Sequence, residues 1–252
     1  MADQLSLRLD SDRLPALPDL RPMLARPLAD AFDSEEHLFE PWWGGMRALV
    51  SIGPADTAGA GAIRIVDAEE VDRTAALPEL AGTAVRVAAR SALIDGELVV
   101  VGVDGRVDPE ALATRLSGAL GRPAAFLAFD LLHLDGRSLL GQPLVKRRDA
   151  LRRILRPGDE VVAVPAIAGE GMALFAAIEA QGLAGMMARQ RQSPYLPGVR
   201  SRLWRFIPVQ SGSGLPAELA AELALAPAEP AATSGTGPVL AMLSRLPLDD
   251  DT

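Results

Sequence analysis

Lys146 is the one lysine in a chain of 252 residues that carries twenty-four arginines. A lysine amine can lose its proton and attack phosphorus or carbonyl carbon, whereas a guanidinium is almost always charged and cannot. Any covalent mechanism built on lysine must therefore use Lys146. Arginine-rich codon usage accounts for the composition as a whole, but it does not account for a lysine that is missing from one particular motif.

Few other side chains have the types and spacing needed for catalysis. The chain has no cysteine, which excludes a thiol nucleophile, a disulfide framework and a thiolate metal site. His37 and His133 are isolated, so their spacing does not indicate a histidine-based metal site. Asp95 and Asp130 lie in the strings DGELV and FDLL, and we interpret them as turn-forming or fold-determining groups rather than as catalysts.

The net charge of −8 is concentrated at the two ends of the chain. Residues 211–252 carry six acids and one arginine, which gives −5, and residues 1–20 add −2. The basic run at 146–156 has helical spacing, and we interpret it as a solvated helix face, with a phosphate-contacting patch as the alternative. Because non-specific DNA binding needs several bases on one face, we expect weak DNA binding or none.

Hydrophobic patterning predicts the elements that would position these side chains. Strand-like runs occur at 37–43, 47–53, 62–67, 92–102, 125–133, 184–189 and around 203–209. Helical periodicity is clear in PEALATRLSGAL, VKRRDALRRIL and GMALFAAIEAQ. The elements do not form a regular βαβ repeat, so the sequence predicts an α+β fold with largely antiparallel sheets.

Four strings, taken in order, resemble the adenylation domain of ATP-dependent DNA ligases of the bacterial repair type found with end-joining systems. They are EPWWGGMRALV, LIDGELVVV, FLAFDLLHLDGRSLLGQPLVKRRDALRRIL and GLAGMMARQRQSPYLPGVRSRLWRFIPV. The resemblance implies a ligase-like nucleotidyltransferase domain, ATP-grasp-like in fold, with ATP and Mg²⁺ as cofactors. In that family a lysine in a K-x-D-G motif attacks the α-phosphate of ATP, and the AMP then passes to a 5′-phosphate at a nick.

The resemblance also shows where this sequence departs from the family. Trp42 stands at the nucleophilic lysine and Gly44 at the aspartate of K-x-D-G. An indole nitrogen is not a nucleophile under these conditions, so no catalytic residue is expected to be intact. We expect Trp42 and Trp43 to fill the emptied pocket as apolar packing, with an exposed recognition pair as the alternative. Lys146 lies at the head of a helix that the family places away from its pocket.

Three further motifs are altered. Ala184 replaces the metal-supporting glutamate of E-G-x-V-x-K, and Arg189 replaces its lysine. Phe206 and Pro208 fall on the paired lysines that steady the nucleotide phosphates. The segment 67–70 stands where the ribose-side S-R-N-G loop would be expected.

The positions that match the family belong to the adenosine side of its pocket. The resemblance assigns nucleotide binding to Glu40, Arg47, Glu97, Phe129 and Arg189, with Glu97 as the metal-supporting carboxylate. Alternative interpretations remain open: Phe129 as a core residue, and Glu97 as the partner of Arg47.

Three segments make up the expected domain organisation. We expect an extended N-terminal segment at 1–20, a ligase-like adenylation domain at 21–209, and a disordered acidic tail rich in alanine and proline at 210–252. We expect no C-terminal OB domain of the kind that relatives carry. The N-terminus lacks a secretory signal, and no run of about eighteen apolar residues suggests a membrane span, which favours a cytoplasmic protein.

These observations favour a pseudoenzyme with a binding or scaffolding role linked to DNA repair. Its protein partner is unknown, and DNA repair factors are the candidates. Fold alone does not confer activity, and the altered motifs are the ones that carry the chemistry. Two alternatives stay open. One is a module that binds ATP non-covalently, and the other is an active ATP-dependent DNA ligase for repair and recombination with a non-standard site.

Overall fold

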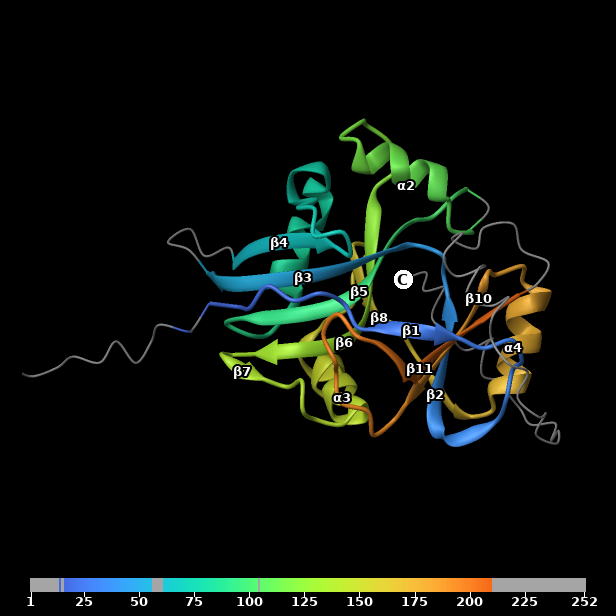
Figure 1. The fold of residues 1–252 in the computed structure, drawn as a ribbon. Helices are drawn as coiled ribbons and strands as arrows, with labels where there is room; N and C mark the ends of the chain where they lie inside the picture. Colours follow the sequence, from blue (N-terminus) through green and yellow to red (C-terminus); the bar gives the residue numbers. More distant parts are fainter. Residues whose placement is uncertain (1–13, 15, 56–60, 104, 210–252) are drawn as a thin grey trace, which may run out of the picture.

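Two β-sheets organise the part of the chain that the computed structural model describes, residues 14, 16–55, 61–103 and 105–209. The central sheet has the strand order β4-β3-β5-β6-β7, with β8 also paired to β6, and the lateral sheet has the order β1-β11-β10-β2-β9. Figure 1 shows the central sheet on the left and the lateral sheet on the right. The chain passes from one sheet to the other directly after β2.

The central sheet is antiparallel except where β8 joins β6 in parallel. Its strands are β3 (Met46–Ala55), β4 (Gly61–Asp67), β5 (Ala92–Val100), β6 (Ala124–Leu134), β7 (Arg137–Ser138) and β8 (Val161–Ala163). Every residue of β5 is buried. A strand covered on both faces reads as a continuous apolar run, so the two acids that β5 contains must find partners inside the protein.

The lateral sheet brings together the two ends of the described chain. Its strands are β1 (Leu24–Pro27), β2 (Ser34–Trp42), β9 (Ile167–Gly169), β10 (Gly185–Gln190) and β11 (Arg200–Pro208). The pair of β1 and β11 is parallel and the other pairs are antiparallel. The chain just after the expected N-terminal segment therefore supplies an edge strand of this sheet.

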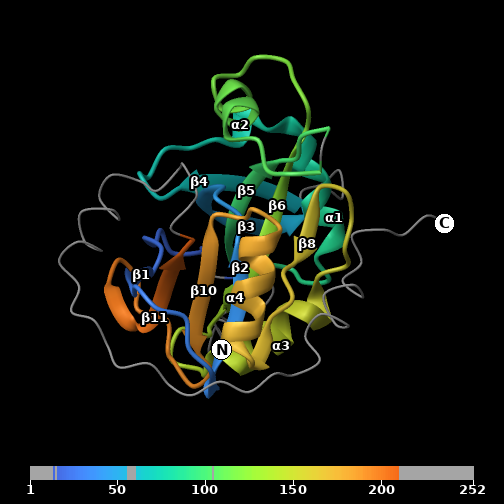
Figure 2. The same ribbon diagram turned by 90° about the vertical axis from the view of Figure 1, so that its right-hand side faces the viewer.

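Within the described ranges, four α-helices and two 3₁₀ helices cover the sheets. They are α1 (Thr83–Arg86), α2 (Pro109–Leu116), α3 (Leu144–Ile154), α4 (Gly171–Ala180), η1 (Thr74–Ala76) and η2 (Pro78–Gly82). The Asp108 side chain caps α2 by accepting a 2.9 Å hydrogen bond from the backbone of Ala111. Figure 2 shows α4 in front of β10 and β2, where Leu174 and Ile178 pack into the core of the lateral sheet.

The predicted α+β class with largely antiparallel sheets is confirmed, and each predicted strand and helix has a counterpart in the described region. Segments 1–13 and 210–252, which include most of the expected N-terminal extension and the whole expected tail, lie outside the described residues. No helix within the described ranges is long and apolar enough to cross a membrane.

Candidate functional site

The sequence-predicted site residues converge where the two sheets meet. Two neighbouring cavities occupy this junction, and both are lined by Glu97 from β5 and by Met187 and Arg189 from β10. The smaller cavity, about 10 Å³, also touches Glu40 and Phe129. The larger one, about 140 Å³, also touches Trp42 and Arg47 among others. The structure thus brings together all five residues that the resemblance assigns to nucleotide binding.

Trp42 holds its indole inside this junction at the end of β2. Its side chain lies close enough to the Glu97 carboxylate to lower the pKa of that acid. Its ring packs edge-on against Phe206, with 4.7 Å between centroids and an interplanar angle of 73°. Both Trp42 and Trp43 are half-buried, and each lines one of the cavities, which agrees with the pocket-filling interpretation. Lys146 is exposed on α3 and lines neither cavity.

The glycines after Trp43 link the two sheets. Gly44 has φ of +74°, and a Cβ added there would lie 4.0 Å from the Cβ of Ala184. The two positions where the family has acids are therefore neighbours in space. Gly45 has no room for a side chain, because an added Cβ would meet the Leu98 carbonyl and would lie 2.7 Å from Val99 Cγ1.

These substitutions do not fit a magnesium site. Among the described residues, no cluster of three or more His, Cys, Asp or Glu side chains is placed to hold a metal ion. Glu97, the expected metal-supporting carboxylate, belongs to no such cluster. Burial raises the pKa of Glu97 to about 7, despite the opposing effects of the Arg47 charge and of Trp42 and Trp43 nearby.

Arg47 pairs with Asp95 rather than with Glu97. Its Nε and Nη2 atoms each lie 2.6 Å from an oxygen of the Asp95 carboxylate. The hydroxyl of Tyr195 donates to the same carboxylate at 2.7 Å and accepts from the backbone N–H of Met23 at 2.9 Å. Of the interpretations left open for Glu97, the ion pair with Arg47 is not observed, because Asp95 offers the bidentate geometry while Glu97 acts on Arg47 only through charge. Asp95 thus lies at the centre of a buried network that joins Arg47 and Tyr195.

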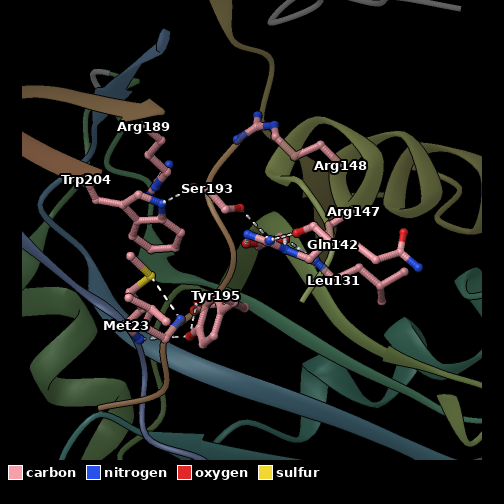
Figure 3. A network of polar contacts seen from close by, with 12 residues as sticks. Met23, Leu131, Gln142, Arg147, Arg148, Arg189, Ser193, Tyr195 and Trp204 are labelled. Carbon is pink, nitrogen blue, oxygen red and sulfur yellow. Dashed lines mark hydrogen bonds and ion pairs between the residues drawn. The ribbon is translucent and has the colours of Figure 1, made fainter. Parts of the chain in front are cut away.

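Phe129 is covered by arginine side chains. Its ring is 4% exposed, and the guanidinium carbons of Arg189 and Arg47 lie 4.0 Å and 4.5 Å from its centroid. Arg189 also lies 4.7 Å from the ring of Trp204, and Figure 3 shows the two side chains next to each other. The adjoining cavity of about 10 Å³ holds at most a single water molecule. An adenine ring could therefore stack on Phe129 only by displacing a guanidinium.

Glu40 is shared by two buried arginines. Its Oε2 lies 2.6 Å from Nη1 of Arg148, and its Oε1 forms an ion pair with Nη1 of Arg189. All three side chains are 3% exposed. Burial lowers the pKa of Arg148 to about 10 and that of Arg189 to about 9, so both remain charged at neutral pH. The carboxylate that the resemblance assigns to the adenine amine is occupied by protein cations.

The prediction that the basic residues at 146–156 form a solvated helix face is wrong for two of them, Arg147 and Arg148. Arg147 is fully buried and forms a bidentate pair with Asp130 at 2.8 Å and 2.7 Å. Its Nη1 also donates to the Ser193 carbonyl at 2.9 Å, and the Ser193 hydroxyl accepts from the Trp204 indole at 3.2 Å (Figure 3). Arg148 turns inward to Glu40, while the remaining basic residues of the run are exposed. The two arginines are buried because each pairs with a buried acid, Asp130 on β6 and Glu40 on β2.

A tight turn occupies the expected ribose loop. The buried Asp67 carboxylate accepts from the backbone N–H groups of Glu69 at 3.1 Å and Val71 at 2.8 Å, and it pairs with Arg73 at 2.7 Å. Glu70 has φ of +66° in this turn. Where the family has a basic loop, this chain therefore has a turn that is held by the side chain of Asp67.

Sequence reasoning missed Arg148, Tyr195 and Trp204 as members of this site. The last two lie in the string SPYLPGVRSRLW, whose spacing matches the family, so the motif itself was the available signal. Arg148 had no such signal, because its partner Glu40 lies 108 residues away in the sequence.

Comparisons with known proteins agree with this geometry. The family model described as "ATP dependent DNA ligase domain" matches residues 22–206. The chain is 33% identical over 189 residues to the multifunctional non-homologous end joining DNA repair protein LigD of Mycobacterium tuberculosis, covering 74% of this chain and 23% of LigD. It is 32% identical over 208 residues to DNA ligase C1 of Mycolicibacterium smegmatis, covering 74% of this chain and 56% of that protein. The chain therefore matches only part of the length of these relatives.

Two solved structures have the same fold. A mycobacterial DNA ligase D in complex with ATP and MES superposes with a TM-score of 0.63 at 30% identity, covering 75% of this chain and 60% of the other. The ligase domain of M. tuberculosis LigD gives a TM-score of 0.62 at 32% identity, covering 74% and 58%. By sequence and by fold, this chain belongs to the ATP-dependent DNA ligase domain family.

Proposed function

We propose that this chain is a ligase-like domain that has lost self-adenylation and acts by binding or scaffolding in DNA end joining or repair. The observation that carries the proposal is the set of contacts that the Trp42 side chain makes. Its indole lies beside Glu97 and its ring packs against Phe206, at the position where the family places the attacking amine. Among the described residues, no other amine lies there, because Lys146 is exposed elsewhere on α3.

The residues around Trp42 support the proposal even apart from the question of whether an indole could act as the nucleophile. Phosphoryl transfer is catalysed mainly by positioning and by neutralising charge on the phosphate oxygens. The positions expected to supply lysines here hold Phe206 and Pro208, which are both buried and uncharged. The positions expected to support the metal hold Gly44 and Ala184. Restoring one residue would therefore leave several functions missing.

Non-covalent ATP binding is less well supported. Glu40 is held by Arg148 and Arg189, and the cavity beside Phe129 measures about 10 Å³. A bound adenosine would have to break this arrangement and bury unpaired charge, which is costly. The repair context of the proposal comes from the relatives, one of which is named as a multifunctional end-joining DNA repair protein. We infer a partner from that setting, with direct DNA contact weak or absent.

The test is intact-mass measurement of the purified chain after incubation with ATP and either Mg²⁺ or Mn²⁺. We expect no AMP-sized adduct, while the ligase domain of M. tuberculosis LigD serves as the positive control. A nicked duplex should stay unsealed under the same conditions. An adduct on this chain would overturn the proposal and would identify the alternative nucleophile when its peptide is sequenced.

A restoration series separates loss of the nucleophile from loss of the whole site. Trp42→Lys alone, and Trp42→Lys with Gly44→Asp, should both fail to form an adduct. The Gly44 position adopts left-handed backbone, which aspartate tolerates better than most residues, so the double variant remains a fair test. Adduct formation by the double variant would mean that Ala184, Phe206 and Pro208 are not limiting.

A further inference from the structure

The segment 16–27, which we call the strap, crosses from one sheet to the other. In Figure 1 it is the blue segment that runs over the central sheet and ends in β1, at the edge of the lateral sheet. Its apolar side chains pack into one core cluster with residues from both sheets. The strap contributes Leu17, Leu20, Met23 and Ala25 to this cluster, and the sheets and the loop before β11 contribute Leu49, Leu93, Leu132, Tyr195 and Trp204.

The strap also covers one side of the candidate site. The carbonyl oxygen of Met23 accepts a hydrogen bond from Nη2 of Arg47 at 3.2 Å. The N–H of Met23 donates to the Tyr195 hydroxyl at 2.9 Å (Figure 3). The next two residues, Leu24 and Ala25, line the larger cavity beside Arg47. If the strap moved away, Arg47 would be uncovered and the cavity would lose one wall.

Most attachments of the strap are of kinds that break easily. Two exposed ion pairs connect it to the chain in and after β4, namely Asp19–Arg64 and Arg21–Glu70. Exposed pairs of this kind contribute little to stability. The strand β1 has only four residues, and it pairs with β11 in a register that shifts after Ala25. Met23, which is 0% exposed, is therefore the main anchor of the strap.

We propose that the strap is a gate, which opens as one unit while both sheets stay folded and so controls access to Arg47 and to the larger cavity. Segments with few buried contacts open at free energies below that of global unfolding. The sheets stay connected when the strap leaves, because β2 runs into β3 and because β10 pairs with both β2 and β11. The gate does not depend on whether the chain forms an AMP adduct.

Thiol labelling tests the gate, because the chain has no cysteine and a single introduced thiol reports only on its own position. Leu49 and Val50 are neighbours on β3 and are 4% and 1% exposed. Leu49 belongs to the cluster under the strap, whereas Val50 belongs to the core on the other face of the sheet. In the full chain, the Leu49→Cys thiol should react with the reagent DTNB at least about 100-fold faster than the Val50→Cys thiol.

The urea dependence of the two labelling rates gives a second readout on the same proteins. Opening of the strap exposes little surface, so low concentrations of urea should change the rate of the Leu49→Cys thiol only weakly. The Val50→Cys thiol reacts only after the central sheet unfolds, so its rate should rise steeply with urea.

Two matched truncations separate opening of the strap from global unfolding. Met23→Ala removes the main anchor and should speed labelling of the Leu49→Cys thiol by more than about 10-fold. Ile178→Ala truncates a side chain on α4 that is 1% exposed in the core of the lateral sheet. Because Ile178 stays packed while the strap is open, this variant should speed labelling of the Val50→Cys thiol alone.

Amide hydrogen exchange identifies the segment that moves. The amide of Leu24 donates to the Val199 carbonyl, and the amide of Tyr195 donates to the Leu140 carbonyl. The Leu24 amide should exchange at least about 10-fold faster than the Tyr195 amide, because only the first belongs to the strap.

Three results would overturn the gate. One is labelling of the Leu49→Cys and Val50→Cys thiols at the same rate with the same urea dependence. Another is equal acceleration of both thiols by Ile178→Ala. The third is concerted exchange of the Leu24 and Tyr195 amides, since the loop that carries Tyr195 would then open together with the strap. These measurements use no nucleotide, so their outcome is separate from that of the AMP-adduct experiment.

Discussion

Removing Glu40 tests whether the buried charges at the sheet junction depend on one another. In the Glu40→Leu variant, Arg148 and Arg189 would keep their burial but lose their shared carboxylate. Removing one partner of a buried ion pair costs about 3–5 kcal/mol, because an uncompensated charge remains in a low-dielectric setting. Arg148 would retain its 2.6 Å hydrogen bond to the Val164 carbonyl, which offsets part of its loss. We therefore expect a destabilisation of about 3–5 kcal/mol.

Replacing the whole triad should have a much smaller effect. In Glu40→Leu with Arg148→Met and Arg189→Met, no charge remains to be desolvated, and apolar side chains of similar length fill the space. We expect the free energy of unfolding to lie within about 2 kcal/mol of the parent value. Such a strongly non-additive result would show that these charges are stabilised mainly by one another.

Urea unfolding followed by far-UV circular dichroism measures both effects, provided that the slope with denaturant stays constant across the variants. Arg152→Ala is the control, because it breaks an exposed ion pair with Asp149 and should change stability by less than about 1 kcal/mol. The reasoning is refuted if Glu40→Leu costs less than about 1 kcal/mol. It is also refuted if the triple variant loses as much as the three single variants together.

Three other predictions concern single positions. Tyr195→Phe removes a hydroxyl that makes two buried hydrogen bonds, so it should lower the free energy of unfolding in urea by about 1–3 kcal/mol. The pKa of Glu97 is raised from 4.5 to about 7 by burial, so the folded state binds this proton more tightly and loses stability as pH rises through that window. Glu97→Gln should remove this dependence, and the stability of the variant relative to the parent should rise by up to about 3 kcal/mol between pH 4.5 and 7 in thermal or urea unfolding. Gly45→Ala should destabilise by about 1–3 kcal/mol because its Cβ would meet β5, whereas Gly141→Ala, with open space around it, should have little effect on the melting temperature.

Local sequence patterns predicted the longer elements of this fold well. The strand predicted at 125–133 is observed at Ala124–Leu134, and the helix predicted in VKRRDALRRIL is observed at Leu144–Ile154. Such segments are long enough for a hydrophobic period to repeat. Strands of two to four residues, such as β1, β7, β8 and β9, were missed because they are too short to show a period.

The site was predictable only in part, and for a different reason. The ordered motifs placed Glu40, Glu97 and Phe129 in one region, which the structure confirms as a shared location. The ion-pair partners of these residues could not be predicted from the motifs. In the sequence, Arg148 looks like any exposed arginine of a basic helix, and its pairing with Glu40 appears only in the folded structure. Long-range ion pairs depend on the packing of the sheets and leave no local pattern.

The pairing of the first strand with the last has a consequence for how the chain folds during synthesis. Leu24 in β1 lies opposite Arg200 in β11, so the lateral sheet cannot close until almost all of the described chain has been made. At about 5–20 residues per second, β2 leaves the ribosome roughly 10 to 30 s before β10 and β11 are available. The strands of the central sheet, from Met46 to Ala163, can pair during that interval. We therefore expect the cavities at the junction to be assembled last, and pulse-labelling hydrogen exchange during refolding should find the amides of β10 protected after those of β5.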